Sequence, residues 1–298
     1  MERGPRLVVA GLAFGLGSGL AYNLGLAVQK RAALRLPEAR GMTPPTARAF
    51  VAHSGWRAGC ALILLGWMLR TLALVCAPVG MVVPLSTACI ATQAWFARRW
   101  FAERLTYLEW YGAGAAVLGM LLIGLSLDPR RDAAGTSIDG AVLAGSLAAC
   151  VALALLARAL AFHRPARAGV ALGAAAGLLF AGTGLLTKVL AIAFAAGNFG
   201  RAAGVLAATI VVGTFGVLVT QSLHQRGRSM VAVPMMNVLA DAVPIALSGV
   251  AFSEAWPGGW RSAARALAFA SILAGVVMLA SSPGATRARG LVSGGDGA

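Results

Sequence analysis

The stretch SMVAVPMMNVLADAVPIALSGVAFSE, residues 229–254, decides the fold class of this 298-residue chain. Between its first and last residues it carries one charged side chain, Asp241, and it is longer than the roughly 20 apolar residues that a helix needs to cross a bilayer. Only 12% of the chain is charged, whereas soluble domains carry about 25%. This composition excludes a soluble enzyme, a disordered chain and a disulfide scaffold, and it predicts an all-α polytopic membrane protein.

Apolar stretches of similar length recur along the chain, and we expect nine transmembrane helices. Their predicted ranges are 7–29, 56–76, 79–98, 107–127, 139–160, 168–196, 202–223, 230–251 and 262–281. The first connection, residues 30–55, contains three prolines, so we expect it to be irregular or to lie at the membrane interface. Residues 285–298 are expected to form a disordered C-terminal tail.

The positive charges indicate how the helices are oriented. The connections after helices 1, 3, 5, 7 and 9 hold 16 lysines and arginines, and the opposite side holds 7. By the positive-inside rule, this asymmetry places the N-terminus outside and the C-terminus in the cytoplasm. The net charge of +15 is therefore interpreted as a topology signal and not as a nucleic-acid-binding surface. We expect the chain to lie in the lipid bilayer of a bacterial cytoplasmic membrane. The sequence is also compatible with a homodimer.

The two halves of the chain share landmarks in the same order. Each half has a Val-Pro pair in an apolar stretch, a Phe-Ala/Ser-Glu turn after it and a tryptophan that begins the next stretch. These are Val83-Pro84, Phe101-Ala102-Glu103 and Trp110, then Val233-Pro234, Phe252-Ser253-Glu254 and Trp260. We therefore expect a first repeat of helices 1–4 (residues 1–128), a linker helix 5 (129–166) and a second repeat of helices 6–9 (167–284). Five crossings separate the repeats, so they are inverted, which is typical of secondary transporters.

With these landmarks the array resembles the drug/metabolite transporter superfamily of EamA-like proteins. Its second half is similar to the NIPA-like magnesium-transporter branch of that superfamily. The similarity rests on short motifs over residues 7–281: Thr187-Lys188, Thr220-Gln221, Ser229-Met230-Val231-Ala232-Val233-Pro234 and Phe252-Ser253-Glu254-Ala255-Trp256. The resemblance implies transport of magnesium or of a small metabolite by alternating access.

Asp241 is the sharpest candidate for a site residue. Pro234, Asn237, Asp241, Pro244 and Ser248 follow one another at intervals of three and four residues, which places them on one face of a helix. A proline removes a backbone hydrogen bond, so Pro234 and Pro244 are expected to break the helix and free carbonyl groups. One interpretation is a carboxylate on the transport path that binds a cation or cycles a proton. The other is a structural ion pair with Lys188 or Arg70.

Further polar residues within predicted helices are candidates for the same path. Charged groups inside a membrane usually face the bundle interior, so we include the cations Lys188 and Arg70. Uncharged candidates form stripes that serve either interhelical hydrogen bonding or a central cavity. These are Tyr22, Asn23, Gln29, Gln93 and Gln221.

Three other proline and glutamate positions are predicted to be structural. Pro84 is expected to break the third helix as Pro234 breaks the eighth. Glu103 and Glu254 occupy matching helix ends on opposite membrane faces, so they cannot act together on one substrate. We expect each to accept hydrogen bonds from free N–H groups of the next helix, or to pair with an arginine such as Arg104.

The sequence does not favour an enzyme. The three histidines are scattered without HExxH spacing, the four cysteines show no CxxC pair, and no GxSxG motif is present. We expect no cofactor. The sequence does not identify ligands for a transported metal. A non-transporting scaffold is the third class considered. For the substrate, one mid-membrane acid favours a cation such as magnesium, whereas nearby Lys188 and Arg70 favour a zwitterionic or anionic metabolite.

Overall fold

The computed structural model describes residues 5–38, 44–76, 82, 90–127, 138–164, 167–253 and 256–283. All regular structure in these residues is helical, with no strand among them. The helices are α1 (Pro5–Ala33), α2 (Pro44–Ala52), α3 (Ser54–Cys76), α5 (Ile90–Phe101), α6 (Tyr107–Ser126), α7 (Gly140–His163), α8 (Ala168–Ala195), α9 (Phe199–Arg226), α10 (Ser229–Ala251) and α11 (Trp260–Ser281).

Seven of the described helices are long and apolar enough to cross a membrane. They are α1, α6, α7, α8, α9, α10 and α11. An eighth candidate is the pair α2 and α3, which meets the same criterion together but is bent by 74° at its break. Helix α5 has 12 residues, and the predicted start of the third span, with Pro84, lies outside the described residues. Helices of this number, length and composition are those of an integral membrane protein.

Two features of the helix boundaries differ from the sequence prediction. Part of the proline-containing connection 30–55 is helical, because Pro44 and Pro45 open α2 at positions where no intrahelical N–H bond is needed. Several helices also run past the predicted ends into their flanking charges, so that Lys30, Arg99 and Arg226 lie within α1, α5 and α9. The exposed head of Arg99 can reach out of the apolar layer, whereas the ammonium of Lys30 is buried and paired with Glu103.

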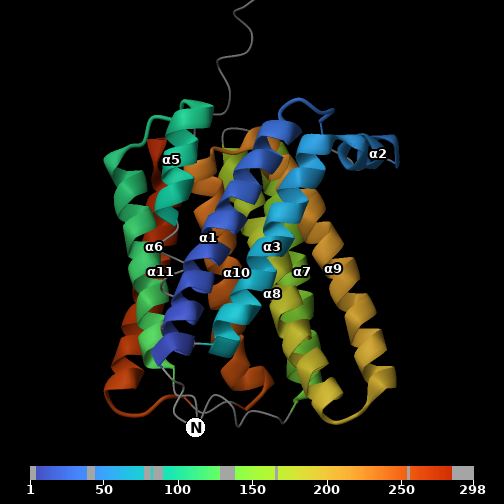
Figure 1. Ribbon diagram of the computed structural model, residues 1–298, viewed down its shortest axis with the longest axis vertical. Coiled ribbons are helices and arrows are strands. Elements are labelled where there is room, and N and C mark those ends of the chain that lie inside the picture. The colour runs from blue at the N-terminus through green and yellow to red at the C-terminus, as the bar shows by residue number, and fades with distance from the viewer. Residues whose placement is uncertain are drawn as a thin grey trace, which may run out of the picture.

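From α3 onward each helix runs opposite to the one before it when the short helix α5 is included, and α1 runs opposite to α3 (Figure 1). Helix α1 begins at the lower end of the bundle, near the marked N-terminus, and α11 ends at the upper end. Helix α1 packs along α3, α6 packs along α11, and α8 packs against α7, α9 and α10. Helix α10 also contacts α5, α6, α7 and α11, so it is the central helix of the bundle.

Glycines set the distance between α8 and α10. A Cβ added at Gly173 or at Gly177 would lie 2.7 Å from a carbonyl oxygen of α10, that of Ala232 and that of Met236 respectively. No side chain fits at that distance, so the two backbones touch. The spacing of four residues between these glycines is typical of close helix packing in membranes. This contact fixes α10, which carries the strongest candidate site residues, against α8.

Candidate functional site

The packing of α1 on α3 positions Arg70. A Cβ added at Gly66 would lie 3.0 Å from the backbone nitrogen of Tyr22 and 3.1 Å from its Cβ, so α3 touches α1 at this point. Arg70 follows Gly66 by one helical turn and lies on the same side of α3. Arg70 therefore belongs to the surface of α3 that meets α1, one helical turn beyond the contact of Gly66 with Tyr22.

Tyr22 also connects α1 to α10. Its hydroxyl donates a hydrogen bond of 3.2 Å to Oδ1 of Asn237. Asp241 follows Asn237 by one turn, and α10 runs in the same direction as α3 (Figure 1). Arg70 and Asp241 each lie one turn beyond a contact with Tyr22, and the two residues therefore occupy a similar depth. The structure thus brings together four predicted site residues from three helices.

Arg70 and Asp241 are oppositely charged, and they are not bonded to each other. Their charges are close enough to interact electrostatically. Within the described part of the chain, however, neither side chain makes a hydrogen bond or a direct ion pair, and both are only half-buried. A charge near the bilayer centre costs at least about 2.5–3.5 kcal/mol, and such groups normally face a bundle interior or a water-filled space. The cluster of Tyr22, Arg70, Asn237 and Asp241 has the features of a polar site within the membrane.

The two prolines of α10 modify this site without breaking the helix. Helix α10 continues through Pro234 and Pro244, so the predicted helix breaks at these positions are wrong. A proline has no N–H to offer the carbonyl four residues earlier, and Pro244 therefore leaves the carbonyl of Ala240 without its usual helical partner. Ala240 directly precedes Asp241. A carboxylate and an unpaired carbonyl oxygen are thus adjacent on α10.

The remaining uncharged candidates are buried elsewhere in the bundle. The Nε2 of Gln29 donates to Sγ of Cys60 at 3.0 Å, and Gln221 accepts a 3.0 Å hydrogen bond from the indole N–H of Trp56. Asn23 donates to the Gly19 carbonyl at 2.8 Å. The contacts of Gln29 and Gln221 join α1 to α3 and α3 to α9, whereas that of Asn23 lies within α1. The Oδ1 of Asn23 and the Oε1 of Gln93 are buried without a hydrogen-bond partner among the described residues.

Lys188 lies toward the end of the bundle opposite to Lys30. Its ammonium sits 4.4 Å from the ring centroid of Phe252, just beyond the last residue of α10. Asp241 is eleven residues earlier on α10, about 17 Å away along the helix axis. The cation that acts electrostatically on Asp241 is Arg70. Glu254, the predicted structural counterpart of Glu103, lies outside the described residues.

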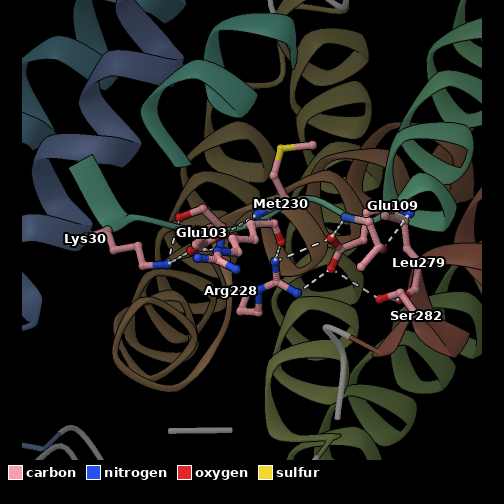
Figure 2. Close-up of polar contacts among 10 residues, drawn as sticks. Lys30, Glu103, Glu109, Arg228, Met230, Leu279 and Ser282 are labelled. Atoms are coloured by element: carbon pink, nitrogen blue, oxygen red, sulfur yellow. Dashed lines mark hydrogen bonds and ion pairs between the residues drawn. The ribbon is translucent and has the colours of Figure 1, made fainter. Parts of the chain in front are cut away.

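A second group of charges lies where α1 and α9 end and α10 begins, and Figure 2 shows its contacts. The ammonium of Lys30 donates to Oε1 of Glu103 at 2.8 Å, to the Gly227 carbonyl at 3.0 Å and to Oγ of Ser229 at 2.7 Å. It also lies 4.6 Å from the ring centroid of Phe101. The side chains of Lys30 and Glu103 are each less than one-tenth exposed. Lys30 therefore ties the end of α1 to the connection 102–106 and to the start of α10.

Glu103 caps a helix, but that helix is α10 and not the next helix in sequence. Its Oε1 accepts the backbone N–H of Ser229 at 2.8 Å, and its Oε2 accepts that of Met230 at 3.2 Å. Its cationic partner is Lys30 and not Arg104. The Arg104 carbonyl instead accepts from Nη2 of Arg228 at 2.5 Å.

Glu109 forms the other half of this end network. Its fully buried carboxylate pairs with Arg228 at 2.6 Å and accepts the backbone N–H of Thr106 at 2.9 Å. The Thr106 hydroxyl in turn accepts the N–H of Glu109, which completes a capping box at the start of α6. A hydroxyl of Ser282 donates to Glu109 at 3.4 Å. Helices α6, α10 and α11 are thus joined at one buried carboxylate.

Sequence reasoning missed Lys30, Glu109 and Arg228 as partners. Lys30 and Arg228 were counted as loop charges that report topology, because each borders an apolar stretch. The signal that was available for Lys30 is its internal counterpart Lys188, since both lysines stand near the end of the first helix of a predicted repeat. No comparable signal marks Glu109 or Arg228, because they meet across 119 residues of sequence.

In the described residues there is no group of three or more histidine, cysteine, aspartate or glutamate side chains that could hold a metal ion. Comparisons of the chain with family models, curated proteins and solved structures find no match. The site is therefore interpreted from its own geometry.

Proposed function

We propose that this chain is a secondary transporter, of the drug/metabolite transporter type, that moves a small solute by alternating access. The observation that carries the proposal is the half-buried Arg70–Asp241 pair, held one turn from Tyr22 and Asn237 in the middle of apolar helices. Charged groups in that position are characteristic of substrate and ion pathways. The proposed architecture has nine spans in two inverted four-helix repeats, with α7 between them.

Equivalent positions in α1 and α8 support the inverted repeat. Three glycines, one aromatic residue and one lysine of α1 recur in α8 after the same interval of 158 residues. The pairs are Gly11 and Gly169, Gly15 and Gly173, Gly19 and Gly177, Tyr22 and Phe180, and Lys30 and Lys188. Helices α1 and α8 run in opposite directions in Figure 1, as an inverted repeat requires.

Equivalent contacts support the same relationship. Gly66 of α3 packs on Tyr22 of α1, and Gly216 of α9 packs on Phe180 of α8, where an added Cβ would lie 2.9 Å from the ring. Gly216 follows Gly66 by 150 residues. Helices α6 and α11, the proposed fourth helices of the repeats, pack on each other. Two related helix pairs and one self-complementary pair are the pattern expected from a pseudo-two-fold axis in the membrane plane.

The orientation of the proposed transporter follows from its arginines. Helices α1, α5 and α9 carry lysine or arginine in their last turns, and all three end at the upper end of the bundle in Figure 1. We assign this end to the cytoplasm by the positive-inside rule, with the N-terminus outside.

The charge pair favours a solute that carries both charges. Mg²⁺ requires near-octahedral oxygen coordination, and the Arg70 guanidinium beside Asp241 would repel it. A small zwitterion places its carboxylate against Arg70 and its ammonium against Asp241, so that each buried charge gains a partner. Magnesium is the second candidate, because the Asp241 carboxylate adjoins the carbonyl freed by Pro244 and because of the family resemblance.

Flux into reconstituted vesicles tests both candidates. Purified protein in liposomes is given a radiolabelled panel of zwitterionic amino acids, monocarboxylates and primary amines, and Mg²⁺ is followed with an entrapped dye. We expect uptake of a zwitterion, and at least tenfold less uptake of analogues that lack either charge. Uptake of Mg²⁺ alone would replace the zwitterion by the second candidate. Absence of flux for every class would contradict the transporter proposal.

A further inference from the structure

Lysine–phenylalanine contacts occur at both ends of the bundle. The ammonium of Lys30 lies 4.6 Å from the Phe101 ring centroid, and that of Lys188 lies 4.4 Å from the Phe252 ring centroid. Each phenylalanine is followed by a residue with positive φ, 50° at Ala102 and 53° at Ser253. No other non-glycine residue in the described ranges has positive φ. L-residues adopt this conformation rarely and at some cost in energy, so its presence at both sites marks one device used twice.

The two contacts lie on either side of the Arg70–Asp241 cluster. Lys30 follows Tyr22 by eight residues on α1, and Ser229 precedes Asn237 by eight residues on α10, so along both helices the Lys30 contact is about 12 Å above the cluster. Phe252 is about 17 Å from Asp241 in the opposite direction along the chain. Along the helix axes, one contact therefore lies between the cluster and each end of the bundle.

We propose that Lys30 and Lys188 are the two gate residues of the transport path, each holding one end of the bundle closed. This inference rests on the transport function proposed above. In the closed state at the cytoplasmic end, Lys30 joins α1 to Glu103 and to the turn between α9 and α10. When that end opens, the Lys30 ammonium leaves these partners and α1 separates from the start of α10.

The hydrogen bonds around Glu103 allow this movement without unfolding. Once Lys30 has left, the Glu103 carboxylate still accepts the N–H groups of Ser229 and Met230 and stays at the positive end of α10. A cavity of about 350 Å³ lies at this end, and Glu103 is part of its wall together with Arg98, Arg104 and Trp110. Opening therefore breaks the contacts of Lys30 and leaves the cap of α10 by Glu103 intact.

Thiol accessibility tests the gates directly. In a variant whose four cysteines are replaced by alanine, Asn237→Cys serves as a reporter at the cluster, and a membrane-impermeant thiol reagent is added from one side of oriented vesicles. We expect Lys30→Met to raise the labelling rate from the cytoplasmic side at least fivefold and to lower it from the other side. Lys188→Met should produce the opposite change. Arg31→Met is the matched control, because Arg31 is the exposed neighbour of Lys30 and should change neither rate.

Several outcomes would overturn the gate assignment. Unchanged labelling in folded Lys30→Met protein would do so, and so would equal increases from both sides or equal effects of Arg31→Met. If Lys30→Met fails to accumulate, Ser229→Ala replaces it, since this change removes one hydrogen bond of Lys30 and keeps its ion pair. Ser229→Ala should raise cytoplasmic labelling about twofold, and no rise would also overturn the assignment. Labelling requires no flux, so a shift of accessibility in a protein that transports nothing contradicts only the transport function.

Discussion

Among the described residues, charged side chains are directly paired at the arginine-rich end of the bundle and are not directly paired in its middle. At the end, the charged side chains of Lys30, Glu103, Glu109 and Arg228 are all paired within 2.6–2.8 Å and carry further hydrogen bonds. In the middle, Arg70 and Asp241 interact only at longer range. Both groups join α10 to the first half of the chain.

The difference indicates what each group of charges does. A buried ion pair compensates its desolvation only when its geometry is good and its remaining donors and acceptors are satisfied, as they are around Glu109. Such a group holds helices in register. Arg70 and Asp241 make no hydrogen bond with their side chains within the described residues, so a bound solute can supply such bonds. Structural and ligand-binding charges should therefore respond differently to loss of one partner.

The largest effect is expected for Glu109→Gln. The amide keeps the shape of the side chain but leaves the Arg228 guanidinium without its anion, and breaking a buried pair in this way costs about 3–5 kcal/mol. We expect the unfolding free energy of the purified protein, measured by denaturant titration in detergent, to fall toward the lower end of this range, because Arg228 is one-fifth exposed. Transport per folded molecule should change little.

Glu38→Gln is the matched control for that measurement. Glu38 lies 3.7 Å from Arg226, and its side chain is half exposed. Exposed ion pairs contribute about 0–1 kcal/mol, so this change should be close to neutral. Equal losses in the two variants would show that burial does not separate them, and the structural role given to Glu109 would then be wrong.

The next effect concerns Asp241. Asp241→Asn should keep normal amounts of protein in the membrane, since the carboxylate has no hydrogen bond to lose within the described residues. Transport should fall tenfold or more, because about 1.4 kcal/mol of lost stabilisation already gives that factor. Ser248→Ala, on the same face of α10, is the control and should transport normally.

Poor accumulation of Asp241→Asn would mean that the charges in the middle of the bundle are structural, like those at its end. If Asp241 is a structural partner of Arg70, Asp241→Asn should accumulate poorly, and a second change Arg70→Gln should restore folding. Lys188→Met should not restore it, because Lys188 lies against Phe252. Recovery of both folding and transport in the double variant Asp241→Asn, Arg70→Gln would show that neither Arg70 nor Asp241 binds the solute.

The sequence was sufficient to predict the helical membrane fold and the Asp241 face of α10. Both follow from local patterns, namely long uncharged stretches and polar residues at intervals of three and four. The proximity of Arg70 to Asp241 depends on Gly66 packing on Tyr22, which connects α3, α1 and α10. Such a contact between distant residues has no local signature, so the sequence left both Lys188 and Arg70 as candidate partners for Asp241.

The end network was missed for a related reason. Lys30, Glu109 and Arg228 border apolar stretches, where a basic residue is expected for topology and an acidic residue for capping. These roles explain each residue locally and hide the pairing between α6 and α10. The predicted helix breaks at Pro234 and Pro244 were wrong because packing against α8, including the contact of Gly184 with Pro244, keeps α10 helical.

The smallest effect is expected for Tyr22→Phe, and it tests whether the cluster is positioned by its neighbours. The change removes the hydroxyl that donates to Asn237 at 3.2 Å and keeps the ring against Gly66. One such hydrogen bond contributes about 0.5–1.5 kcal/mol, so we expect a two- to tenfold loss of transport with normal folding. Because the charges of Arg70 and Asp241 remain, the loss should appear as a raised KM for the zwitterion, while Asp241→Asn should also lower the maximal rate. The second half already carries the matching residue, since Phe180 packs on Gly216 without a hydroxyl. An unchanged KM in Tyr22→Phe would mean that the hydroxyl does not position α10, and that the Gly66 contact alone sets the separation of the two charges.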